Sequence, residues 1–419
     1  MDWVYLAVSV NGAVYTLNAY KPVKRNMVLF FPSFFASWIT IELAWVHLVW
    51  QVALTAVMAR KGVLRSGKGK FALLLNLASW AGLALIVWRS LGTRHEIKAA
   101  FADLDAPEPE ARRHGVKRTR NIVFNRVAGK TLRLDIYEPG RAAEPGVKRP
   151  AVLQIHGGGW ILGDKREQGL PLLRHLAGEG WVGFNANYRL SPGATFPDHL
   201  VDIKRAIEWI RAHADDYDVD PDFIAVTGGS AGGHLAALTA LTGNDPAFQR
   251  GFEDADTSIQ AAVPFYGVYD FTNRNGYYPD DIVPKFMGPW IIKADIDEEP
   301  EKFAAASPLD QITPEAPPFL VIHGDNDTLA PVEGARDFVE ELRATSKAPA
   351  LYLELKGAQH AFEIFPSIRA NQVVRAVTRF LDAVHAEYEK GVAPRDMPDE
   401  VLAEKVDEVT PSSEDVTAS

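Results

Sequence analysis

The segment IAVTGGSAGGHLAALTA, residues 224–240, passes from a β-branched apolar run through glycines into a stretch of helical composition. Its centre, Gly-Gly-Ser-Ala-Gly, is a G-x-S-x-G pattern, in which glycines permit a sharp turn and expose the serine before a helix. The pattern alone is common, but a preceding strand and a following helix form the context in which it carries a nucleophile. The segment therefore predicts a strand–turn–helix unit with Ser230 as the nucleophile.

Strands and helices alternate on both sides of this segment. Residues 122–139 contain two β-rich runs around AGK, which is a hairpin signal. Further strands are predicted at AVLQI, VGFNANY, FIAVTG, AAVPFYGVYD, PFLVIHG and ALYLELKG, with helices between most of them. This alternation predicts an α/β fold, in which helices cover both faces of a mostly parallel sheet. Functional residues in such folds gather at the carboxyl ends of the strands.

A serine nucleophile requires a general base and an acid that orients the base. The chain order expected for this fold is serine, acid, histidine, and His323, His360 and His385 all follow the serine and its helix. His360 is predicted to be the base because it follows the last predicted strand. Asp327, in HGDNDTLAP, is predicted to be the acid because the residues after it let the carboxylate reach the histidine loop. Asp325 is the alternative, and its expected role is to stabilise the turn.

The segment PAVLQIHGGGW, residues 150–160, follows a predicted strand with three consecutive glycines. Attack on a carbonyl group creates an oxyanion, which needs preorganised N–H donors and an approach free of side chains. We assign the amides of Gly157, Gly158 and Ala231 as these donors, and we expect His156 to hold the loop by hydrogen bonds. A phosphate-binding loop is the rival interpretation, but the sequence has no G-x-x-x-x-G-K-[ST] motif.

The first 92 residues are rich in apolar and aromatic side chains. Residues 28–59 carry one charged side chain, Glu42, and residues 70–88 carry none after the first lysine. About 20 apolar helical residues span a bilayer core of ~30 Å, so both stretches are long enough. A third stretch, residues 3–20, is interrupted by two asparagines and is expected to cross the bilayer or to lie flat in its interface. Glu42 is expected to face another helix.

Residues 1–92 are therefore predicted to be a helical, membrane-anchoring region, and a buried helical hairpin of a soluble protein is the alternative. The basic residues around the apolar stretches nearly balance, so the side of the membrane stays open. Residues 93–119 are predicted to be a linker and 120–389 the catalytic domain. The last segment, 390–419, is acidic and is predicted to be disordered.

Composition excludes several other classes of protein. The net charge of −10 argues against a nucleic-acid partner, because phosphate binding requires clustered positive charge. The chain has no cysteine, so it has no disulfide, no thiolate metal site and no cysteine nucleophile. No metal and no cofactor are expected.

Five motifs in order, HGGGW, YRLSPGATFP, GGSAGG, HGDNDTLAP and QHAF, resemble the hormone-sensitive-lipase-like carboxylesterases of the α/β-hydrolase fold. The resemblance implies hydrolysis of short- to medium-chain carboxylic esters without a cofactor. It implies Ser230, Asp327 and His360 as a catalytic triad, below an oxyanion hole formed by the three amides assigned above. The membrane segments in front of this domain make the chain similar to membrane-associated lipases or esterases of actinobacteria.

Two features depart from that family. Gly229 precedes the serine, where many of these esterases have aspartate, so the chain also resembles feruloyl-type and small-ester esterases and formamidases. The usual N-terminal cap helices are not evident, and the membrane segments occupy their place. An insert at residues 271–303 is expected to cover part of the site. The residues predicted to contact the substrate are Trp160, Tyr277, Phe286 and Trp290.

The sequence thus predicts a membrane-anchored serine carboxylester hydrolase that acts on a small-molecule or lipid ester. One alternative is an amidase, formamidase or acyltransferase with the same triad. The other alternative belongs to a different class and is a catalytically inactive ligand-binding protein on the same fold.

Overall fold

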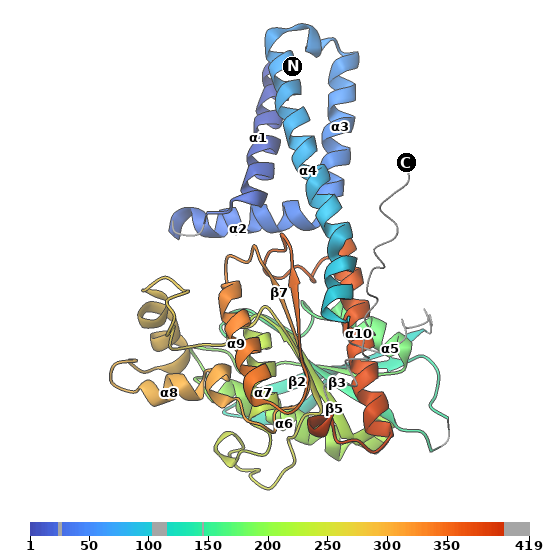
Figure 1. The fold of residues 1–419 in the computed structure, drawn as a ribbon, viewed down its shortest axis with the longest axis vertical. Coiled ribbons are helices and arrows are strands. Elements are labelled where there is room, and N and C mark those ends of the chain that lie inside the picture. Colours follow the sequence, from blue (N-terminus) through green and yellow to red (C-terminus); the bar gives the residue numbers. More distant parts are fainter. Residues whose placement is uncertain (24–26, 103–114, 145, 398–419) are drawn as a thin grey trace, which may run out of the picture.

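The computed structural model describes residues 1–23, 27–102, 115–144 and 146–397. A column of three helices stands above an α/β domain, and a fourth helix lies across the base of the column (Figure 1). The predicted acidic tail lies outside the described residues from 398 onward, as does part of the predicted linker, residues 103–114.

The α/β domain is built on one eight-stranded sheet with the order β1-β2-β4-β3-β5-β6-β7-β8. Strands β3 to β8 are parallel, whereas β2 pairs antiparallel with both β1 and β4. This arrangement confirms the predicted α/β fold with a mostly parallel sheet. The strands are β1 Val116–Val127, β2 Lys130–Pro139, β3 Arg149–Ile155, β4 Val182–Ala186, β5 Val219–Gly229, β6 Ala261–Phe265, β7 Phe319–Gly324 and β8 Ala350–Leu355.

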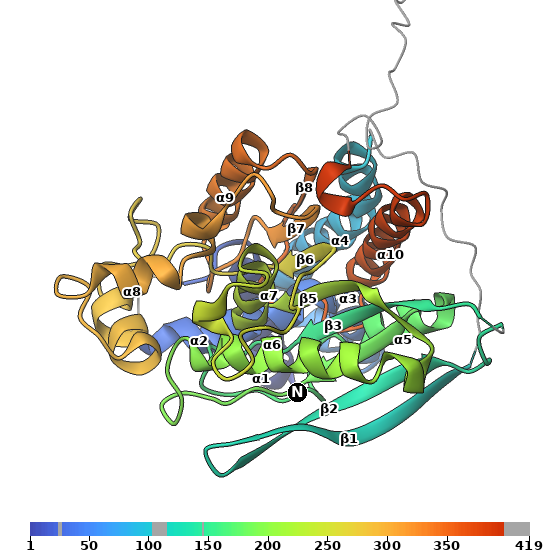
Figure 2. The ribbon, with the colours of Figure 1, turned by 90° about the horizontal axis from the view of Figure 1, so that it is seen from below.

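The predicted hairpin is formed by β1 and β2, and it lies at one edge of the sheet (Figure 2). Its two-residue turn places Ala128 at φ +48° and Gly129 at φ +72°. Positive φ at both central residues gives a turn whose twist matches that of the flanking strands, and glycine adopts this conformation at little cost.

Helices cover both faces of the sheet, and each face has its own hydrophobic core. On one face α5 (Leu170–Glu179) and α10 (Ile368–Glu389) pack on the sheet, and on the other α6 (Asp198–Ala212), α7 (Ala231–Leu241) and α9 (Val332–Thr345) do so. Successive residues of β3 point to opposite faces, so Val152 lies in one core and Leu153 in the other. Shorter elements are η1 Val63–Arg65, η2 Ala214–Tyr217, η3 Pro246–Phe248, the π-helix η4 Val283–Ile292, α8 Pro300–Ala305, η5 Pro308–Gln311 and η6 Pro394–Asp396.

The N-terminal region consists of α1 (Asp2–Tyr20), α2 (Met27–Glu42), α3 (Ala44–Arg60) and α4 (Gly67–Ala100). The apolar stretch 28–59 was expected to be one long membrane segment. It does not form a single helix, because α2 and α3 meet at an angle of 84°. Helix α3 joins α1 and α4 in the column, whereas α2 lies across its base, against the α/β domain (Figure 1).

Glu42, at the end of α2, accounts for the direction of this bend. Its carboxylate accepts a hydrogen bond from Ser367 Oγ at 2.7 Å and lies 3.5 Å from Arg369 Nη1 of α10. Both side chains of the ion pair are 1% exposed. Glu42 therefore faces a helix, as expected, but the helix belongs to the α/β domain rather than to the column.

Helix α4 links the column to the α/β domain without interruption. Its 34 residues extend over about 51 Å, well beyond the ~30 Å of a bilayer core. The last turns of α4 lie beside α10, where Ile97 and Ala100 pack against the core that contains Phe101. The helix thus runs through position 92, where the sequence suggested the start of a linker.

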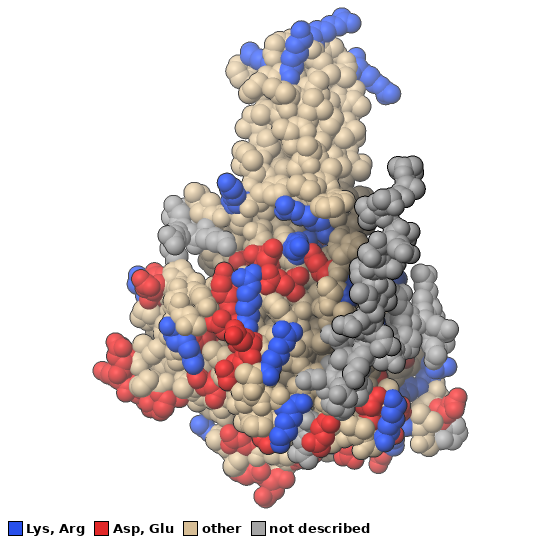
Figure 3. All heavy atoms as spheres, in the orientation of Figure 1, with Lys and Arg blue, Asp and Glu red and all other residues tan. Residues whose placement is uncertain are grey.

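The interior of the column contains several polar residues, and its outer surface is apolar. Tyr5, Thr55 and Asn76 are buried and joined by side-chain hydrogen bonds of 3.0 to 3.1 Å, and Thr16 and Ser79 are 2.7 Å apart. The outward residues of the column are more than half exposed and include Trp3, Val14, Leu17, Trp45, Val49, Trp50, Leu74 and Trp88. Figure 3 shows a column surface without charge between Lys and Arg side chains at its two ends.

In the described part of the chain, α4 is the one helix long and apolar enough to cross a bilayer by itself, and α2 with α3 meet the same criterion only as a bent pair. Only 28% of the most apolar window of α4 is buried, whereas the core helix of a soluble protein would be mostly buried.

The buried ion pair provides a test of how firmly α2 is attached. Glu42→Leu leaves Arg369 buried without its carboxylate, so we expect a loss of about 3–5 kcal/mol in the free energy of unfolding in detergent. The double variant Glu42→Leu/Arg369→Met should recover most of that loss. Asp281→Leu, which breaks the exposed ion pair with Lys285, is the control and should cost no more than about 1 kcal/mol. Equal effects of Glu42→Leu and Asp281→Leu would contradict the attachment.

Candidate active site

Ser230 occupies the sharp turn between β5 and α7, where its backbone has φ +59° and ψ −122°. This conformation is strained for a residue with a side chain and persists only when its surroundings enforce it. A Cβ atom on Gly228 would lie 2.5 Å from the carbonyl oxygen of Gly232, and one on Gly232 would lie 2.2 Å from that of Ile155. The two flanking glycines are therefore required by close contact between backbones.

Gly229, the departure from the family pattern, also has a structural explanation. A Cβ atom at this position would lie 2.5 Å from the hydroxyl oxygen of Tyr266. Tyr266 is fully buried, and its ring centroid lies 4.5 Å from that of His360. An aspartate in place of Gly229 would displace this tyrosine, which stands between the turn and the histidine.

His360 and Asp327, from two different loops, form the closest acid–base contact of the site. His360 Nδ1 lies 2.6 Å from Asp327 Oδ2. The other carboxylate oxygen accepts the backbone N–H groups of Leu329 and Ala330, at 2.8 and 2.9 Å. Burial opposes ionisation of Asp327, but His360 and His323 outweigh it and hold the pKa of this carboxyl below its ordinary value. His323 Nε2 lies 3.3 Å from the same carboxylate.

Asp325, the alternative acid, has a different partner. Its carboxylate accepts the N–H of Gly357 at 2.6 Å, which ties the loop after β7 to the loop after β8. In this structure Asp327, and not Asp325, contacts the histidine.

Gln359 connects the loop of the acid to the loop of the base. Its side-chain oxygen accepts hydrogen bonds from the backbone N–H of Thr328 at 2.8 Å and from that of His360 at 2.9 Å. The Thr328 hydroxyl also donates to it, at 3.2 Å. One buried amide thus fixes the distance between the segments that carry Asp327 and His360.

The glycine loop after β3 packs directly against the turn of Ser230. A Cβ atom on Gly157 would lie 3.1 Å from Ser230 Cβ and 2.5 Å from the carbonyl oxygen of Gly229. The side chain of His156 stacks on Tyr188 with ring centroids 4.4 Å apart, and its Nδ1 lies 2.8 Å from the carbonyl oxygen of Gly157. His156 holds the loop, as expected, and burial lowers its pKa.

The assignment of Gly157 as an oxyanion donor is wrong in this structure. Its N–H donates to the side-chain oxygen of Gln168 at 2.6 Å, so the hydrogen is not available to a substrate. The next two residues, Gly158 and Gly159, have φ values of +118° and +59°. Neither of their amides, nor that of Ala231, has a hydrogen-bond acceptor among the described residues.

The four residues predicted to contact substrate have different positions. Trp160 is 3% exposed and donates to His234 Nδ1 at 3.1 Å, so it belongs to the core beneath the loop. Phe286, in the insert, lies at the glycine loop, because a Cβ atom on Gly159 would be 3.6 Å from its ring. Tyr277 and Trp290, also in the insert, have 39% and 46% of their surface exposed, and none of their contacts among the described residues places them at the glycine loop.

His234 is structural, as the sequence suggested. Its two ring nitrogens contact Trp160 and the carbonyl oxygen of Ala306, and burial lowers its pKa to about 3. The described residues contain no group of three or more His, Asp or Glu side chains that could hold a metal ion.

Helix α2 contacts the loop that carries His360. The indole N–H of Trp38 donates to the carbonyl oxygen of Ala361 at 2.9 Å, and Ser37 Oγ lies 3.4 Å from the side-chain nitrogen of Gln359. The ring of Phe34 faces that of His360 edge-on, with centroids 6.5 Å apart. The N-terminal region therefore forms part of the wall of this site.

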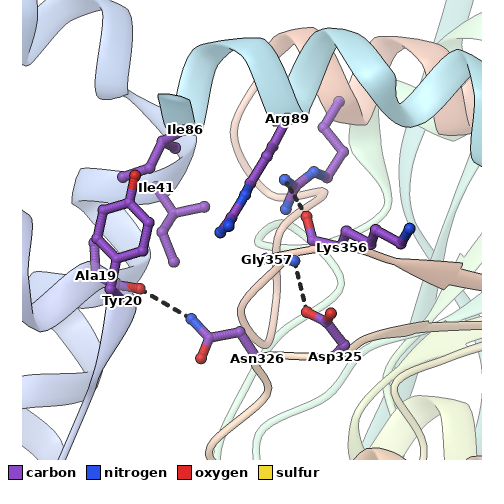
Figure 4. Close-up of a pocket in the computed structure, with 10 residues that line it drawn as sticks. Ala19, Tyr20, Ile41, Ile86, Arg89, Asp325, Asn326, Lys356 and Gly357 are labelled. Atoms are coloured by element: carbon purple, nitrogen blue, oxygen red, sulfur yellow. Dashed lines mark hydrogen bonds between the residues drawn. The ribbon is translucent and has the colours of Figure 1, made fainter. Parts of the chain in front are cut away.

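The acid loop is also attached to the N-terminal region. Asn326, next to Asp327, donates from its side-chain nitrogen to the carbonyl oxygen of Ala19, at the end of α1, at 3.0 Å (Figure 4). Sequence reasoning did not identify Gln168, Gln359 or His323 as supporting residues. His323 lies four residues before Asp327, and Gln359 directly precedes His360. This closeness in sequence to the predicted acid and base was the signal that could have identified both as supporting residues.

Gln359 can be tested as a positioning residue. Gln359→Ala removes the acceptor of three donors, so we expect kcat for a chromogenic ester to fall about tenfold with a smaller change in KM. Gln359→Glu keeps the acceptor oxygens and should retain more of kcat. A general loss of folding would instead lower the melting temperature of both variants in parallel with activity, and equal kcat values for the two variants would contradict the positioning role.

Comparison with known proteins identifies the family of this chain. The BD-FAE family model matches residues 134–342. The probable carboxylic ester hydrolase LipM of Mycobacterium tuberculosis is 38% identical over 414 residues, which cover 93% of this chain and 95% of LipM. Esterase LipQ of the same organism is 40% identical over 72% of this chain and 70% of its own. The alignment with LipM extends into the N-terminal helices.

Solved structures give the same result for the α/β domain. Esterase 2 of Thermogutta terrifontis with bound butyrate is 28% identical, has a TM-score of 0.54 and covers 67% of this chain and 96% of that one. A truncated carbohydrate esterase from gut microbiota, at 23% identity and a TM-score of 0.54, shares the fold. This chain is a carboxylesterase and belongs to the hormone-sensitive-lipase-like family of the α/β-hydrolase fold.

Proposed function

We propose that the protein is a membrane-anchored serine carboxylester hydrolase with Ser230, His360 and Asp327 as its catalytic triad. The observation that carries this proposal is the 2.6 Å contact between His360 Nδ1 and Asp327, which leaves Nε2 as the ring nitrogen without a hydrogen-bond partner among the described residues. The strained turn at Ser230 is the second support, because a G-x-S-x-G serine between a strand and a helix is the context in which the motif carries a nucleophile.

The proposed reaction proceeds through an acyl-enzyme. His360 takes the proton of the Ser230 hydroxyl as its oxygen attacks the ester carbonyl, and then protonates the leaving alcohol. Water, deprotonated by the same histidine, cleaves the acyl-enzyme and releases the acid. Asp327 stabilises the imidazolium that forms twice in this cycle, and its depressed pKa keeps it ionised throughout.

The oxyanion of each tetrahedral intermediate needs N–H donors with no other acceptor. We assign the amides of Gly158, Gly159 and Ala231 to this role. The Gly157 amide is excluded by its bond to Gln168, which instead holds the loop in place. Each oxyanion donor typically contributes about 3–4 kcal/mol to lowering the barrier.

The proposed substrate is an ester with a short- to medium-length acyl chain. The similar esterase 2 of T. terrifontis carries butyrate in one structure and is phosphonylated by sarin in another. Phe286, beside the glycine loop, provides an apolar surface for such a chain. An acyltransferase or amidase would use the same residues, and hydrolysis is favoured here because the relatives at 38–40% identity are named as ester hydrolases or esterases.

Membrane anchoring is supported by the arrangement of the column. Its interior includes hydrogen-bonded polar side chains and its exposed surface is apolar, which is the pattern of a helical bundle in lipid rather than in water. Basic side chains lie at both ends of the uncharged surface (Figure 3). With α1, α3 and α4 all crossing, the loop at residues 61–66 and the α/β domain lie on opposite sides of the membrane.

The triad can be tested with a matched pair of variants. Ser230→Ala should abolish both ester hydrolysis and labelling by a fluorophosphonate probe. Asp327→Asn should reduce kcat by about 1,000-fold or more, because the amide no longer stabilises the imidazolium. Asp325→Asn, two residues away, keeps an acceptor for the Gly357 N–H and should retain activity within about threefold. A larger effect at position 325 than at 327 would assign the acid to Asp325.

The crossing of the membrane can be tested by cysteine labelling, because the natural chain has no cysteine. Single variants Lys61→Cys, in the loop between α3 and α4, and Asp254→Cys, on the α/β domain, place one exposed thiol at each proposed side. A membrane-impermeant maleimide should label them from opposite sides of sealed vesicles. Labelling of both from one side, or release of the protein from membranes by alkaline carbonate, would contradict three crossings.

A further inference from the structure

A cavity of about 330 Å³ lies where the column meets the α/β domain (Figure 4). Its apolar wall comes from the column side and includes Ala19, Ile41 and Ile86. Its opposite wall is formed by Asn326 and Gly357, in the loops after β7 and β8. The cavity lies apart from the glycine loop and from Ser230, and the proposed hydrolysis does not use it.

Three cationic residues line this cavity, Arg89, Lys356 and Arg369. Arg89 extends from α4 toward the loops of the α/β domain, whereas the side chain of Lys356 extends away from Arg89 (Figure 4). Arg89 contacts the ring of Tyr20, 5.5 Å from its centroid, and forms no ion pair with a described carboxylate. The ammonium group of Lys356 likewise forms no ion pair within the described residues.

Arg369 is buried and only partly satisfied. It is 1% exposed, and its two terminal nitrogens contact Glu42 at 3.5 Å and the carbonyl oxygen of Lys356 at 3.1 Å. Its Nε has no hydrogen-bond partner among the described residues. A buried guanidinium nitrogen without an acceptor is costly, so an acceptor from a ligand would stabilise this arrangement.

Three carboxylates lie in or near the cavity. Asp325, the one acid that lines it, accepts the Gly357 N–H. Glu42 is bound by Ser367 and Arg369, and Glu96 Oε1 lies 3.4 Å from the backbone nitrogen of Lys356. Arg369 thus has Glu42 as its counter-ion, and Arg89 is a lining cation that has no carboxylate partner among the described residues.

We propose that this cavity binds the phosphate group of an anionic membrane lipid. Arginine and lysine side chains are the usual protein ligands of phosphate, and the apolar wall on the column side fits the glycerol and the first acyl carbons. The volume equals that of about ten waters, at ~30 Å³ each, which exceeds the need of a free phosphate ion. The cavity also lies at the end of the uncharged column, at the level where lipid headgroups would stand if the column spans the bilayer.

The bound lipid would connect the two parts of the molecule. Arg89 belongs to α4 and Arg369 to α10, so one phosphate contacted by both would add a bridge beside the existing Asn326–Ala19 hydrogen bond. The lipid is a ligand of this joint and not the ester that is hydrolysed.

Binding can be measured without any ester. The full-length protein in a non-ionic detergent is titrated calorimetrically with dihexanoylphosphatidylglycerol, dihexanoylphosphatidylcholine and inorganic phosphate, each at the same ionic strength. We expect saturable binding of the phosphatidylglycerol and at least tenfold weaker binding of the other two ligands. Arg89→Gln should weaken binding of the phosphatidylglycerol about tenfold or more, because a charge-assisted contact is lost.

Arg94→Gln is the matched control, because Arg94 is an exposed arginine of the same helix, five residues further and about 140° around its axis. It should bind the lipid as the natural protein does. Arg89→Lys keeps the charge and should show an intermediate affinity, and the melting temperature of each variant without lipid verifies that it folds.

Inorganic phosphate that binds as tightly as the lipid and depends on Arg89 would assign the site to free phosphate instead. No saturable binding of the phosphatidylglycerol, or equal losses in Arg89→Gln and Arg94→Gln, would overturn the proposal. Because no ester is present, failure of this test leaves the assignment of the triad unaffected, and an inactive Ser230→Ala protein should bind the lipid normally.

Discussion

Two glycine turns, one after β3 and one after β5, approach so closely that neither can carry ordinary side chains at the contact. Atoms added at Gly157 and Gly232 would lie 2.5 Å and 2.2 Å from backbone oxygens of the opposite turn or strand. This contact explains why three glycines follow a buried strand, a combination that is unfavourable for local order. It brings free backbone amides beside Ser230, and the rest of the proposed chemistry depends on that proximity.

The acid and the base reach this point from the other half of the sheet, and their loops are held by partners outside the triad. Gln359 joins the two loops through its side-chain oxygen, and Tyr266 fills the space between His360 and the serine turn. Helix α2 then contacts the base loop through Trp38. An N-terminal region expected to be only an anchor is therefore part of the structure that positions the site, and a boundary at residue 92 would cut through α4.

The sequence was sufficient for the parts of the molecule that local pattern determines. Alternating strands and helices predicted the sheet, and the G-x-S-x-G turn, the AGK hairpin and the His360 loop all lie where the pattern placed them. The sequence favoured Asp327 over Asp325 as the acid but could not exclude Asp325, because the partners of the two carboxylates, His360 and Gly357, are distant in the chain.

The errors also have physical causes. Residues 28–59 are almost uniformly apolar, so hydropathy could not reveal a bend that depends on Glu42 meeting Arg369 more than 300 positions later. The donor at Gly157 could not be excluded from sequence, because the acceptor that occupies it, Gln168, lies beyond the loop in a segment without a recognisable motif. Trp160 was predicted to contact the substrate, but its indole N–H donates to the buried His234 and its ring lies in the core, a contact between residues 74 positions apart.

The polar contacts between α2 and the α/β domain carry a further consequence for how the molecule meets a membrane. One side of α2 is fixed by Trp38 and Glu42, while Phe31 and Phe35 remain half exposed on the same helix. A helix that lies across the base of the column with such a surface suits the boundary between headgroups and acyl chains, where aromatic rings are favoured. Since the same helix contacts the loop of His360, a shift of α2 would also change the geometry of the proposed base.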